Sequence, residues 1–362
     1  MSLKISWFSR HKIKILAIVL GVVLTGSIIG SVLWITQEQS KTALYCYHAG
    51  SLTVPFATYA SKWQTLNPTY IIYNSPHGSA TAIRQLTENG KPTDLIGSAD
   101  YSLIISMMME VQVPGQNYNY SDWYIITCRN AMVIAYITAN SPPWLDNLTR
   151  DTSPQKWYEI LNRTDVTIGR ADPYQDPCGY RTLMVWGLAD EYQYGLLNNQ
   201  WDSNIINQSF YDKDPITGHS GEGTNLVKSK ETDLISSLQA GEIDYLFIYR
   251  SIAKQHGLNY LSLDDHLDLS NESLSDFYAN VTVNRKSPII PGAQSSDIAA
   301  KPIVYGITIP NTAPHPEAAI QYVKFMLGSP GVWIDNYQEP VWPYLTNNVS
   351  LLPTQLQPYC IN

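Results

Sequence analysis

The chain has 362 residues, of which 44% are apolar and 15% are charged, so it can form two domains with cores of their own and is not a disordered tail. Its formal net charge of −8 argues against nucleic acid as a partner. Any anion that it binds is therefore held by local geometry and not by an overall positive field.

The N-terminus carries a candidate membrane anchor. An uncharged, mostly apolar run from Ile15 to Ile35 follows basic residues that include Arg10, Lys12 and Lys14. This length matches the thickness of a bilayer, and the basic flank favours a cytoplasmic N-terminus. A cleaved secretion signal is the alternative, but the residues after the run form a poor cleavage site. We therefore expect residues 1–40 to be an uncleaved anchor with its flank and the rest of the chain to lie outside the cytoplasm.

From residue 42 the chain alternates between strand and helix patterns. The expected strands cover 43–47, 70–74 and 94–98, and the expected helices run to about Leu66, over 80–89 and over 101–109. The first two strand-to-helix turns share one chemistry, Gly50-Ser51 and Gly78-Ser79. Both serines are natural N-caps for the helices that follow.

The second half repeats this alternation. It predicts strands at 124–127, 131–138, 166–171, 243–249, 281–283 and 303–309, and helices at 180–194, 230–241, 253–256 and 316–327. The segment Leu197 to Gly223 has little periodicity and is expected to be an exposed insertion. Alternating strands and helices indicate an α/β fold whose mostly parallel sheets are flanked by helices. Two such sheets, with the chain crossing between them twice, leave a cleft edged by helix N-termini.

Several chemically suggestive residues fall at helix starts or at a strand end. They are Gly50, Ser51, Gly78, Ser79, Asp176, Pro177, Cys178, Glu231 and Tyr249. Each has an ordinary structural explanation, since serines cap helices and acids in a first turn favour the helix dipole. A Pro-x-Gly turn into a helix, as at Pro177, also offers free N–H groups to an anion. The adjacent acid Asp176 then needs an explanation.

Catalytic and metal-binding alternatives have less support. The four cysteines, Cys46, Cys128, Cys178 and Cys360, show no zinc-type spacing, and their pairing is not readable from sequence. No base lies near Cys178 in sequence to activate it as a nucleophile. His48 and His77 flank the Gly-Ser turns, but without a Cys/His cluster they are not expected to bind metal.

These residues carry a family resemblance. The matching motifs are His48-Ala49-Gly50-Ser51-Leu52, Pro55-Phe56, Gly78-Ser79, Gly90 to Asp94, Ala99 to Ile104, Asp176-Pro177-Cys178-Gly179-Tyr180-Arg181, Gly241 to Tyr245 and Tyr249-Arg250-Ser251. Together they resemble the archaeal molybdate/tungstate-binding proteins of ABC transporters, over nearly all of residues 42 to 345. The block from Asp176 to Arg181 is the most specific of them.

The resemblance implies a type II periplasmic-binding-protein fold, with two lobes that close on a ligand. We expect lobe 1 to comprise residues 41–128 and 252–362, and lobe 2 to comprise residues 129–251. The implied role is a monomeric, non-enzymatic receptor without a cofactor, which passes tungstate or molybdate to the permease and ATPase of an ABC importer. The anchor without a lipobox cysteine and the insertion depart from the family pattern.

The resemblance also assigns roles in the pocket. It gives hydrogen bonds to the oxyanion to Ser51, Ser79 and the Tyr249 hydroxyl, and to backbone N–H groups near Gly50 and in the Pro177-Cys178 turn. Asp176 and Glu231 match the two carboxylates that approach the metal centre of the oxyanion. Glu242 is an alternative candidate for the second carboxylate. Glu231 is preferred because it begins a helix.

The two carboxylates have a chemical rationale. A carboxylate beside a dianion in a dry site costs on the order of several kcal/mol in repulsion. Tungsten and molybdenum can accept two further oxygen ligands, which offsets this cost. Sulfate and phosphate cannot expand in this way, so the same acids reject them.

Two other functions remain open at this level. The first is a receptor for another ligand, such as sulfate or ferric ion, which would have no use for the pair of acids. The second is a secreted hydrolase that uses Asp176 and Glu231 as an acid/base pair. The sequence does not distinguish tungstate from molybdate.

Overall fold

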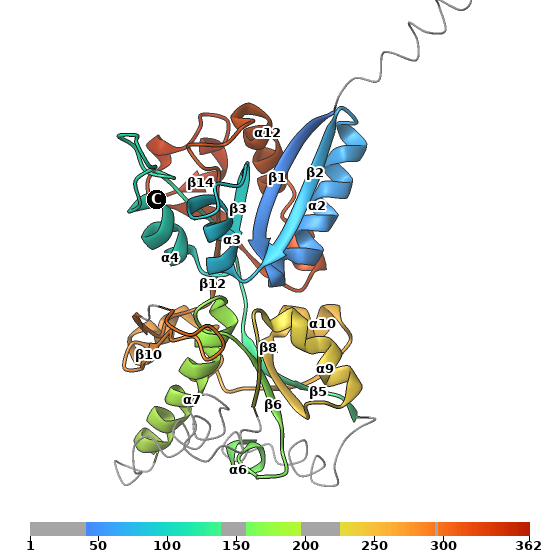
Figure 1. Ribbon diagram of the computed structural model, residues 1–362, viewed down its shortest axis with the longest axis vertical. Helices are drawn as coiled ribbons and strands as arrows, with labels where there is room; N and C mark the ends of the chain where they lie inside the picture. The colour runs from blue at the N-terminus through green and yellow to red at the C-terminus, as the bar shows by residue number, and fades with distance from the viewer. Residues whose placement is uncertain (1–40, 139–156, 197–224, 294–295) are drawn as a thin grey trace, which may run out of the picture.

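The computed structural model describes residues 41–138, 157–196, 225–293 and 296–362. These residues form two lobes, one above the other in Figure 1, and each lobe is built around its own sheet with helices packed on it. The chain therefore has the two-lobed α/β architecture that the alternating pattern predicts.

Lobe 1 holds a seven-stranded sheet in the order β14-β13-β4-β12-β3-β1-β2. Its elements before the first crossing are β1 (Thr42–Ala49), η1 (Gly50–Leu52), α2 (Thr53–Leu66), β2 (Tyr70–His77), α3 (Ser79–Thr87), β3 (Leu95–Ser98), α4 (Tyr101–Ile104), η2 (Ile105–Met109) and β4 (Ile125–Arg129). Its elements after the return are β12 (Val304–Thr308), α12 (Pro316–Leu327), α13 (Gly331–Asp335), β13 (Glu339–Thr346), η6 (Val349–Leu351), η7 (Gln357–Tyr359) and β14 (Cys360–Ile361).

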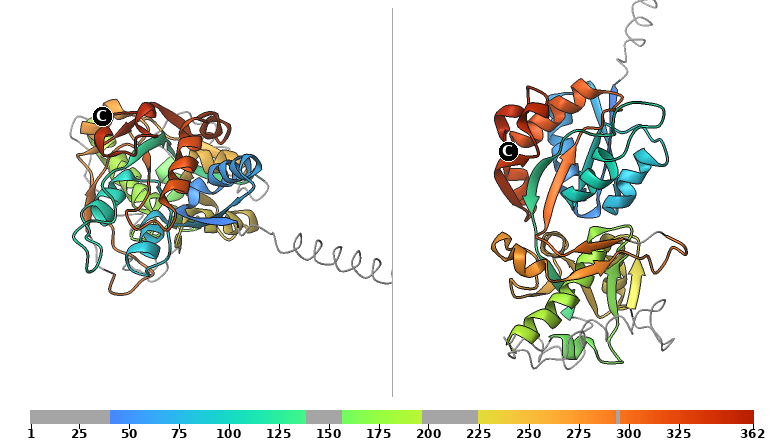
Figure 2. Two further views of the ribbon diagram at one scale, coloured as in Figure 1. Left: turned by 90° about the horizontal axis from the view of Figure 1, so that it is seen from above. Right: turned by 90° about the vertical axis from the view of Figure 1, so that its left-hand side faces the viewer.

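Lobe 2 holds a five-stranded sheet in the order β7-β6-β8-β5-β9 and a small β10-β11 hairpin. Its elements are β5 (Met132–Tyr136), α6 (Trp157–Leu161), β6 (Ile168–Ala171), α7 (Pro177–Leu196), β7 (Asn225–Lys228), η4 (Glu231–Leu234), α9 (Ile235–Ala240), β8 (Tyr245–Tyr249), α10 (Arg250–Gln255), β9 (Asn259–Ser262), η5 (Glu272–Leu274), α11 (Ser275–Tyr278), β10 (Thr282–Asn284) and β11 (Asp297–Ala299). Figure 2 shows the structure from above (left) and the two lobes, again one above the other, from the side (right).

Helix α2 illustrates how the sequence forms the core of lobe 1. Its buried side chains include Phe56, Tyr59, Ala60 and Trp63, which recur at the spacing of one helical face. This face packs on the sheet and on α13, where the Tyr59 ring lies 5.1 Å from the ring of Trp333. All four cysteines are buried and unpaired, so they serve as small apolar residues of the two lobes.

The sheets are mixed, so the expectation of mostly parallel sheets was wrong. β1 pairs in parallel with β2 and β3, but β12 returns from lobe 2 and inserts antiparallel between β3 and β4. In lobe 2, β5 is antiparallel to both β8 and β9. β12 and β5 run against their neighbours because each is the first strand of its sheet after a crossing, so the chain enters the sheet from the side of the other lobe.

The second crossing comes later than we expected. β9 (Asn259–Ser262) pairs with β5, so residues after 251 still belong to the sheet of lobe 2. The chain returns to lobe 1 between β11 and β12. β9 is a short edge strand with no fully buried side chain, and a strand of this kind has no clear hydrophobic period.

Two expectations concern residues outside the described ranges. The apolar run Ile15 to Ile35 and the insertion Leu197 to Gly223 both lie there. Within the described ranges, no helix is long and apolar enough to span a bilayer.

Candidate functional site

The residues that the sequence singled out meet where the two lobes touch. Helix α7 points its first turn toward lobe 1, as Figure 1 shows. A Cβ built on Gly50 of lobe 1 would lie 3.4 Å from both carboxylate oxygens of Glu231 in lobe 2. A Cβ built on Gly78 would lie only 2.3 Å from the carbonyl oxygen of Gln175. The two glycines therefore let the backbone of lobe 1 approach the acidic segments of lobe 2 closely.

The two serines are fully buried. Both were expected to cap helices, but neither does. Ser51 lies inside η1, and Ser79 is the first residue of α3, whose N-cap is Gly78. The Ser51 Oγ atom instead accepts a hydrogen bond from the Tyr305 hydroxyl at 3.0 Å, and the Ser79 Oγ atom accepts one from the Ala99 N–H at 3.0 Å.

Asp176 connects the starts of α7 and η4. Its Oδ1 atom accepts from the Cys178 N–H at 2.9 Å, and its Oδ2 atom accepts from the Glu231 N–H at 3.2 Å. The Cys178 N–H, which the resemblance assigned to the oxyanion, thus bonds to Asp176. Pro177 begins the helix, where the missing N–H of a proline costs nothing. Burial raises the pKa of Asp176 in spite of these hydrogen bonds.

Glu231 is the unusual group of the site. It is 1% exposed, and no described N–H or O–H group donates a hydrogen bond to either of its carboxylate oxygens; the carboxyl group of Asp176 is within reach of a hydrogen bond only when one of the two acids is protonated. Burial and the neighbouring charge of Asp176 raise its pKa well above the ordinary value. The alternative acid, Glu242, is exposed. A buried carboxyl group without a partner is costly, so Glu231 calls for either a proton or a ligand.

Tyr249 and Cys178 have defined partners. The Tyr249 hydroxyl accepts a hydrogen bond from Arg181 Nη1 at 2.7 Å. The Cys178 Sγ atom lies 3.7 Å from the carbonyl oxygen of Phe247, and burial raises the pKa of this thiol well above its ordinary value. A buried, protonated thiol is a poor nucleophile, as expected from the sequence.

A buried ionic network beside the site was not predicted. Asp100 of lobe 1 accepts a hydrogen bond from the Tyr180 hydroxyl of lobe 2 at 2.6 Å, and it lies 3.1 Å from Lys301 Nζ and 4.0 Å from Arg181 Nη2. Burial opposes the ionisation of Asp100, but the charges of Lys301 and Arg181 outweigh it and hold the pKa of Asp100 well below its usual range. Asp100, Tyr180 and Arg181 lie in motifs that carry the family resemblance. The resemblance therefore pointed to these three residues but assigned them no role in the site.

The two histidines do not form a metal site with these acids. His48 is buried, with a pKa lowered by burial to about 4, and the His77 Nε2 atom lies 3.0 Å from Ser75 Oγ. Within the described part of the chain, the group with metal-ligand spacing is Asp264, Asp265 and His266 in lobe 2. These three residues already contact one another, with His266 Nδ1 2.8 Å from Asp264 Oδ1.

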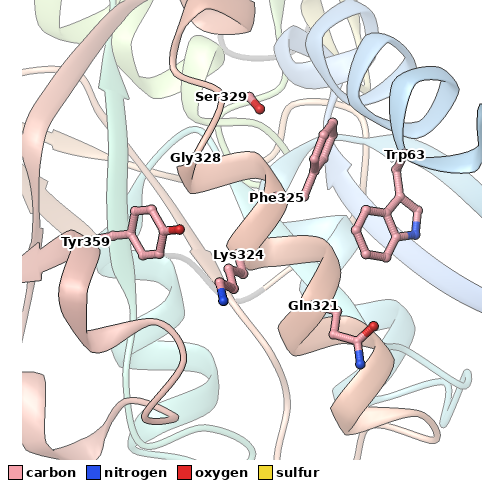
Figure 3. A pocket seen from close by; sticks show the side chains of 7 residues that line it. All are labelled: Trp63, Gln321, Lys324, Phe325, Gly328, Ser329 and Tyr359. Atoms are coloured by element: carbon pink, nitrogen blue, oxygen red, sulfur yellow. The ribbon is translucent and has the colours of Figure 1, made fainter. Parts of the chain in front are cut away.

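A separate groove lies on lobe 1 between α2, α12 and the C-terminal segment (Figure 3). Its volume is about 380 Å³, and it is lined by Trp63, Gln321, Lys324, Phe325, Gly328, Ser329 and Tyr359. No residue that the sequence singled out as a ligand contact lines this groove.

The fold and the buried polar junction define a class: a two-lobed α/β protein with a buried polar site where its lobes meet. The comparison with protein families agrees. The chain belongs to the family described as bacterial extracellular solute-binding protein, whose model matches residues 44–334.

Curated relatives extend this assignment over most of the chain. The chain is 37% identical over 332 residues to the molybdate/tungstate-binding protein WtpA of Pyrococcus abyssi, which covers 85% of this chain and 88% of that protein. It is 36% identical to an uncharacterized solute-binding protein of Petrotoga mobilis, covering 89% of this chain and 91% of that protein. Among solved structures, the sulfate-binding protein SubI of Mycobacterium tuberculosis has a TM-score of 0.52 at 12% identity, over 83% of this chain and 87% of that one. This structural likeness shows the fold.

The raised pKa of Glu231 predicts how stability depends on pH. Its native pKa lies above the ordinary value of 4.5, so the folded state favours the protonated form, and stability is lost as the pH rises through the native pKa. Without added anion, Glu231→Gln should therefore melt about 3 °C or more above the wild type at pH 8, and the difference should shrink near pH 4.5. Differential scanning calorimetry measures this. Exposed Glu242→Gln is the control, and equal melting of E231Q and the wild type at pH 8 would contradict the expectation.

The close approach at Gly78 predicts a closure defect. Gly78→Ala places a methyl group against the Gln175 carbonyl oxygen and should hold the lobes apart. Affinity for tungstate, the anion expected from the sequence, should fall at least roughly tenfold, because the loss of lobe contacts costs more than about 1.4 kcal/mol. Gly331→Ala, where an added Cβ meets nothing within 4 Å, is the matched control. Calorimetric titration of both variants decides, and wild-type affinity in G78A would show that this contact does not limit closure.

Proposed function

We propose that this chain is an extracytoplasmic receptor that captures tungstate or molybdate between its lobes and delivers it to an ABC importer. Ser51, Ser79 and the Tyr249 hydroxyl would donate hydrogen bonds to the oxyanion, with backbone N–H groups near Gly50. Asp176 and Glu231 would supply oxygen ligands to the metal centre.

The observation that carries the proposal is the buried carboxyl group of Glu231. No described N–H or O–H group donates a hydrogen bond to its oxygens, and it lies beside a second buried acid, Asp176, with which it can share a hydrogen bond only when one of the two is protonated. When both acids are ionised, such a pair repels a simple dianion. A high-valent metal that accepts two more oxygen ligands instead turns both acids into attractive contacts. Tungstate and molybdate meet this requirement.

The comparisons support the same ligand class. The relative in Pyrococcus abyssi is named a molybdate/tungstate-binding protein, and so is one in Thermococcus kodakarensis, at 36% identity over 83% of this chain. The extracellular solute-binding family supports a location outside the cytoplasm and a binding role without catalysis. The partners would then be the permease and the ATPase of the importer, and the receptor would act as a monomer without a cofactor.

The first test separates the acids from the serines. Asp176→Ala and Glu231→Ala each remove a ligand of the metal centre and also a source of repulsion. They should therefore weaken the binding of tungstate but leave the binding of sulfate unchanged or slightly tighter. Ser51→Ala and Ser79→Ala remove donors that any oxyanion uses, so they should weaken both anions by about 1 to 3 kcal/mol.

The measurement is a pair of dissociation constants, for tungstate and sulfate, in each of the four variants. Wild-type affinity for tungstate should be submicromolar, roughly −8 kcal/mol or better. X-ray absorption at the tungsten edge reports the coordination number. Unchanged affinity and coordination in both acid variants would overturn the proposed ligation, as would equal affinity of the wild type for sulfate and tungstate.

The N-terminal run Ile15 to Ile35 would tether the receptor as an uncleaved helix with its basic flank in the cytoplasm. Membrane fractions of cells that express the full chain should then contain the protein with its N-terminus intact, as intact-mass spectrometry would measure. A soluble species that begins near residue 40 would instead establish a cleaved secretion signal.

A further inference from the structure

We infer that three residues outside the proposed ligand contacts, Asn130, Tyr305 and Arg181, are positioning residues that force the hydroxyls of Ser51 and Tyr249 to donate hydrogen bonds toward the anion. The inference deepens the proposed function and rests on it. A hydroxyl can either donate or accept toward a ligand, so its direction decides whether an oxyanion is attracted.

The first chain of hydrogen bonds begins at the crossing between β4 and β5. The Asn130 Oδ1 atom accepts from the backbone N–H groups of Ala131 and Ser251, at 3.0 Å and 3.3 Å. This orients the amide, so Nδ2 donates to Ser251 Oγ at 2.8 Å and to the Tyr305 hydroxyl at 3.0 Å. All of these groups are buried.

The direction of the next bonds follows from the first. Because the Tyr305 oxygen accepts from Asn130, its single proton is free to be donated to Ser51 Oγ, which lies 3.0 Å away. Ser51 then accepts from Tyr305, and its own proton points elsewhere. The neighbouring Gly50 faces Glu231 across the lobe junction, which places the Ser51 turn at the proposed anion site.

Arg181 has the corresponding effect on Tyr249 in lobe 2. A guanidinium group only donates, so the bond of 2.7 Å from Nη1 makes the Tyr249 oxygen the acceptor and leaves its proton for another partner. Arg181 and Tyr249 are both fully buried. Ser79 follows the same rule, because its Oγ atom accepts from a backbone N–H group.

The consequence concerns the class of anion. Three hydroxyls from both lobes, those of Ser51, Ser79 and Tyr249, each already accept a hydrogen bond from the protein and have a proton left to give. They suit an oxyanion whose oxygens carry no protons, such as tungstate, molybdate or sulfate. They offer a poor match to the protonated oxygen of hydrogen phosphate.

Double-mutant cycles test this inference. Tyr305→Phe keeps the ring, which lies 6.0 Å from the ring of Tyr249, and removes the donor to Ser51. Y305F should weaken tungstate binding about tenfold when Ser51 is present and less than about twofold in the S51A background. An equal loss in both backgrounds would overturn the inference, because a general packing defect does not depend on the Ser51 hydroxyl. Equal melting temperatures of Y305F and the wild type without anion serve as the folding control.

A second cycle pairs Arg181→Met with Tyr249→Phe. The loss of tungstate affinity caused by R181M should be at least about fivefold smaller in the Y249F background, since the charge of Arg181 acts in both backgrounds but its hydrogen bond acts in one. Additive losses would overturn the assignment of Arg181.

A competition experiment gives a second measurement, the selectivity between two anions, which should not change if Tyr305 has only a structural role. Against bound molybdate, hydrogen phosphate should compete better relative to sulfate in Y305F than in the wild type, and an unchanged ratio would overturn the selectivity argument. If the wild type binds neither tungstate nor molybdate, the proposed function fails together with this inference. If it binds them and the cycles are additive, the inference alone fails.

Discussion

The buried carboxyl group of Glu231 is the constraint on which the lobe junction depends. It lies beside Asp176 and against the backbone at Gly50, and no described N–H or O–H group donates a hydrogen bond to its oxygens. In most buried sites such a group would be replaced or paired, because its desolvation is not compensated. Under the proposed function, a ligand with a strong positive centre between the lobes would compensate this cost.

Closure also has contacts of its own beside the site. The bond between Asp100 and Tyr180 joins lobe 1 to α7, and Lys301 neutralises the same carboxylate from the segment that leads back into lobe 1. Hydrogen bonds to a buried charged group are stronger than neutral ones, and they need precise geometry. The network can therefore align the first turn of α7, which carries Asp176, with the serine turns of lobe 1. The glycines at 50 and 78 allow this approach because neither carries a Cβ.

The site contains hydroxyl groups and carboxyl groups, and the proposed function gives these two kinds of polar group different roles in recognising the anion. In the proposed site, the hydroxyls of Ser51, Ser79 and Tyr249 would attract any proton-free oxyanion, because each already accepts a hydrogen bond from the protein. The carboxyl groups of Asp176 and Glu231, when ionised, would repel such an anion unless its central atom accepts further ligands. Under the proposed function, affinity would come from the hydroxyls and selectivity from the balance between the hydroxyls and the acids.

The sequence by itself determined the local features of this protein. Helix α12 begins at Pro316 and ends at Leu327 as predicted, because a proline at the first position and a following glycine mark its ends within the segment itself. The Gly-Ser turns, the Asp176 turn and the start of η4 at Glu231 were likewise readable from short-range patterns. Tertiary structure alone decided which hydrogen-bond partners the buried polar groups have. Ser51 was expected to cap a helix, but its partner is Tyr305, which lies 254 residues away on a strand inserted antiparallel between β3 and β4. Local propensity carries no information about a contact at that separation, since it depends on the strand order of the whole sheet.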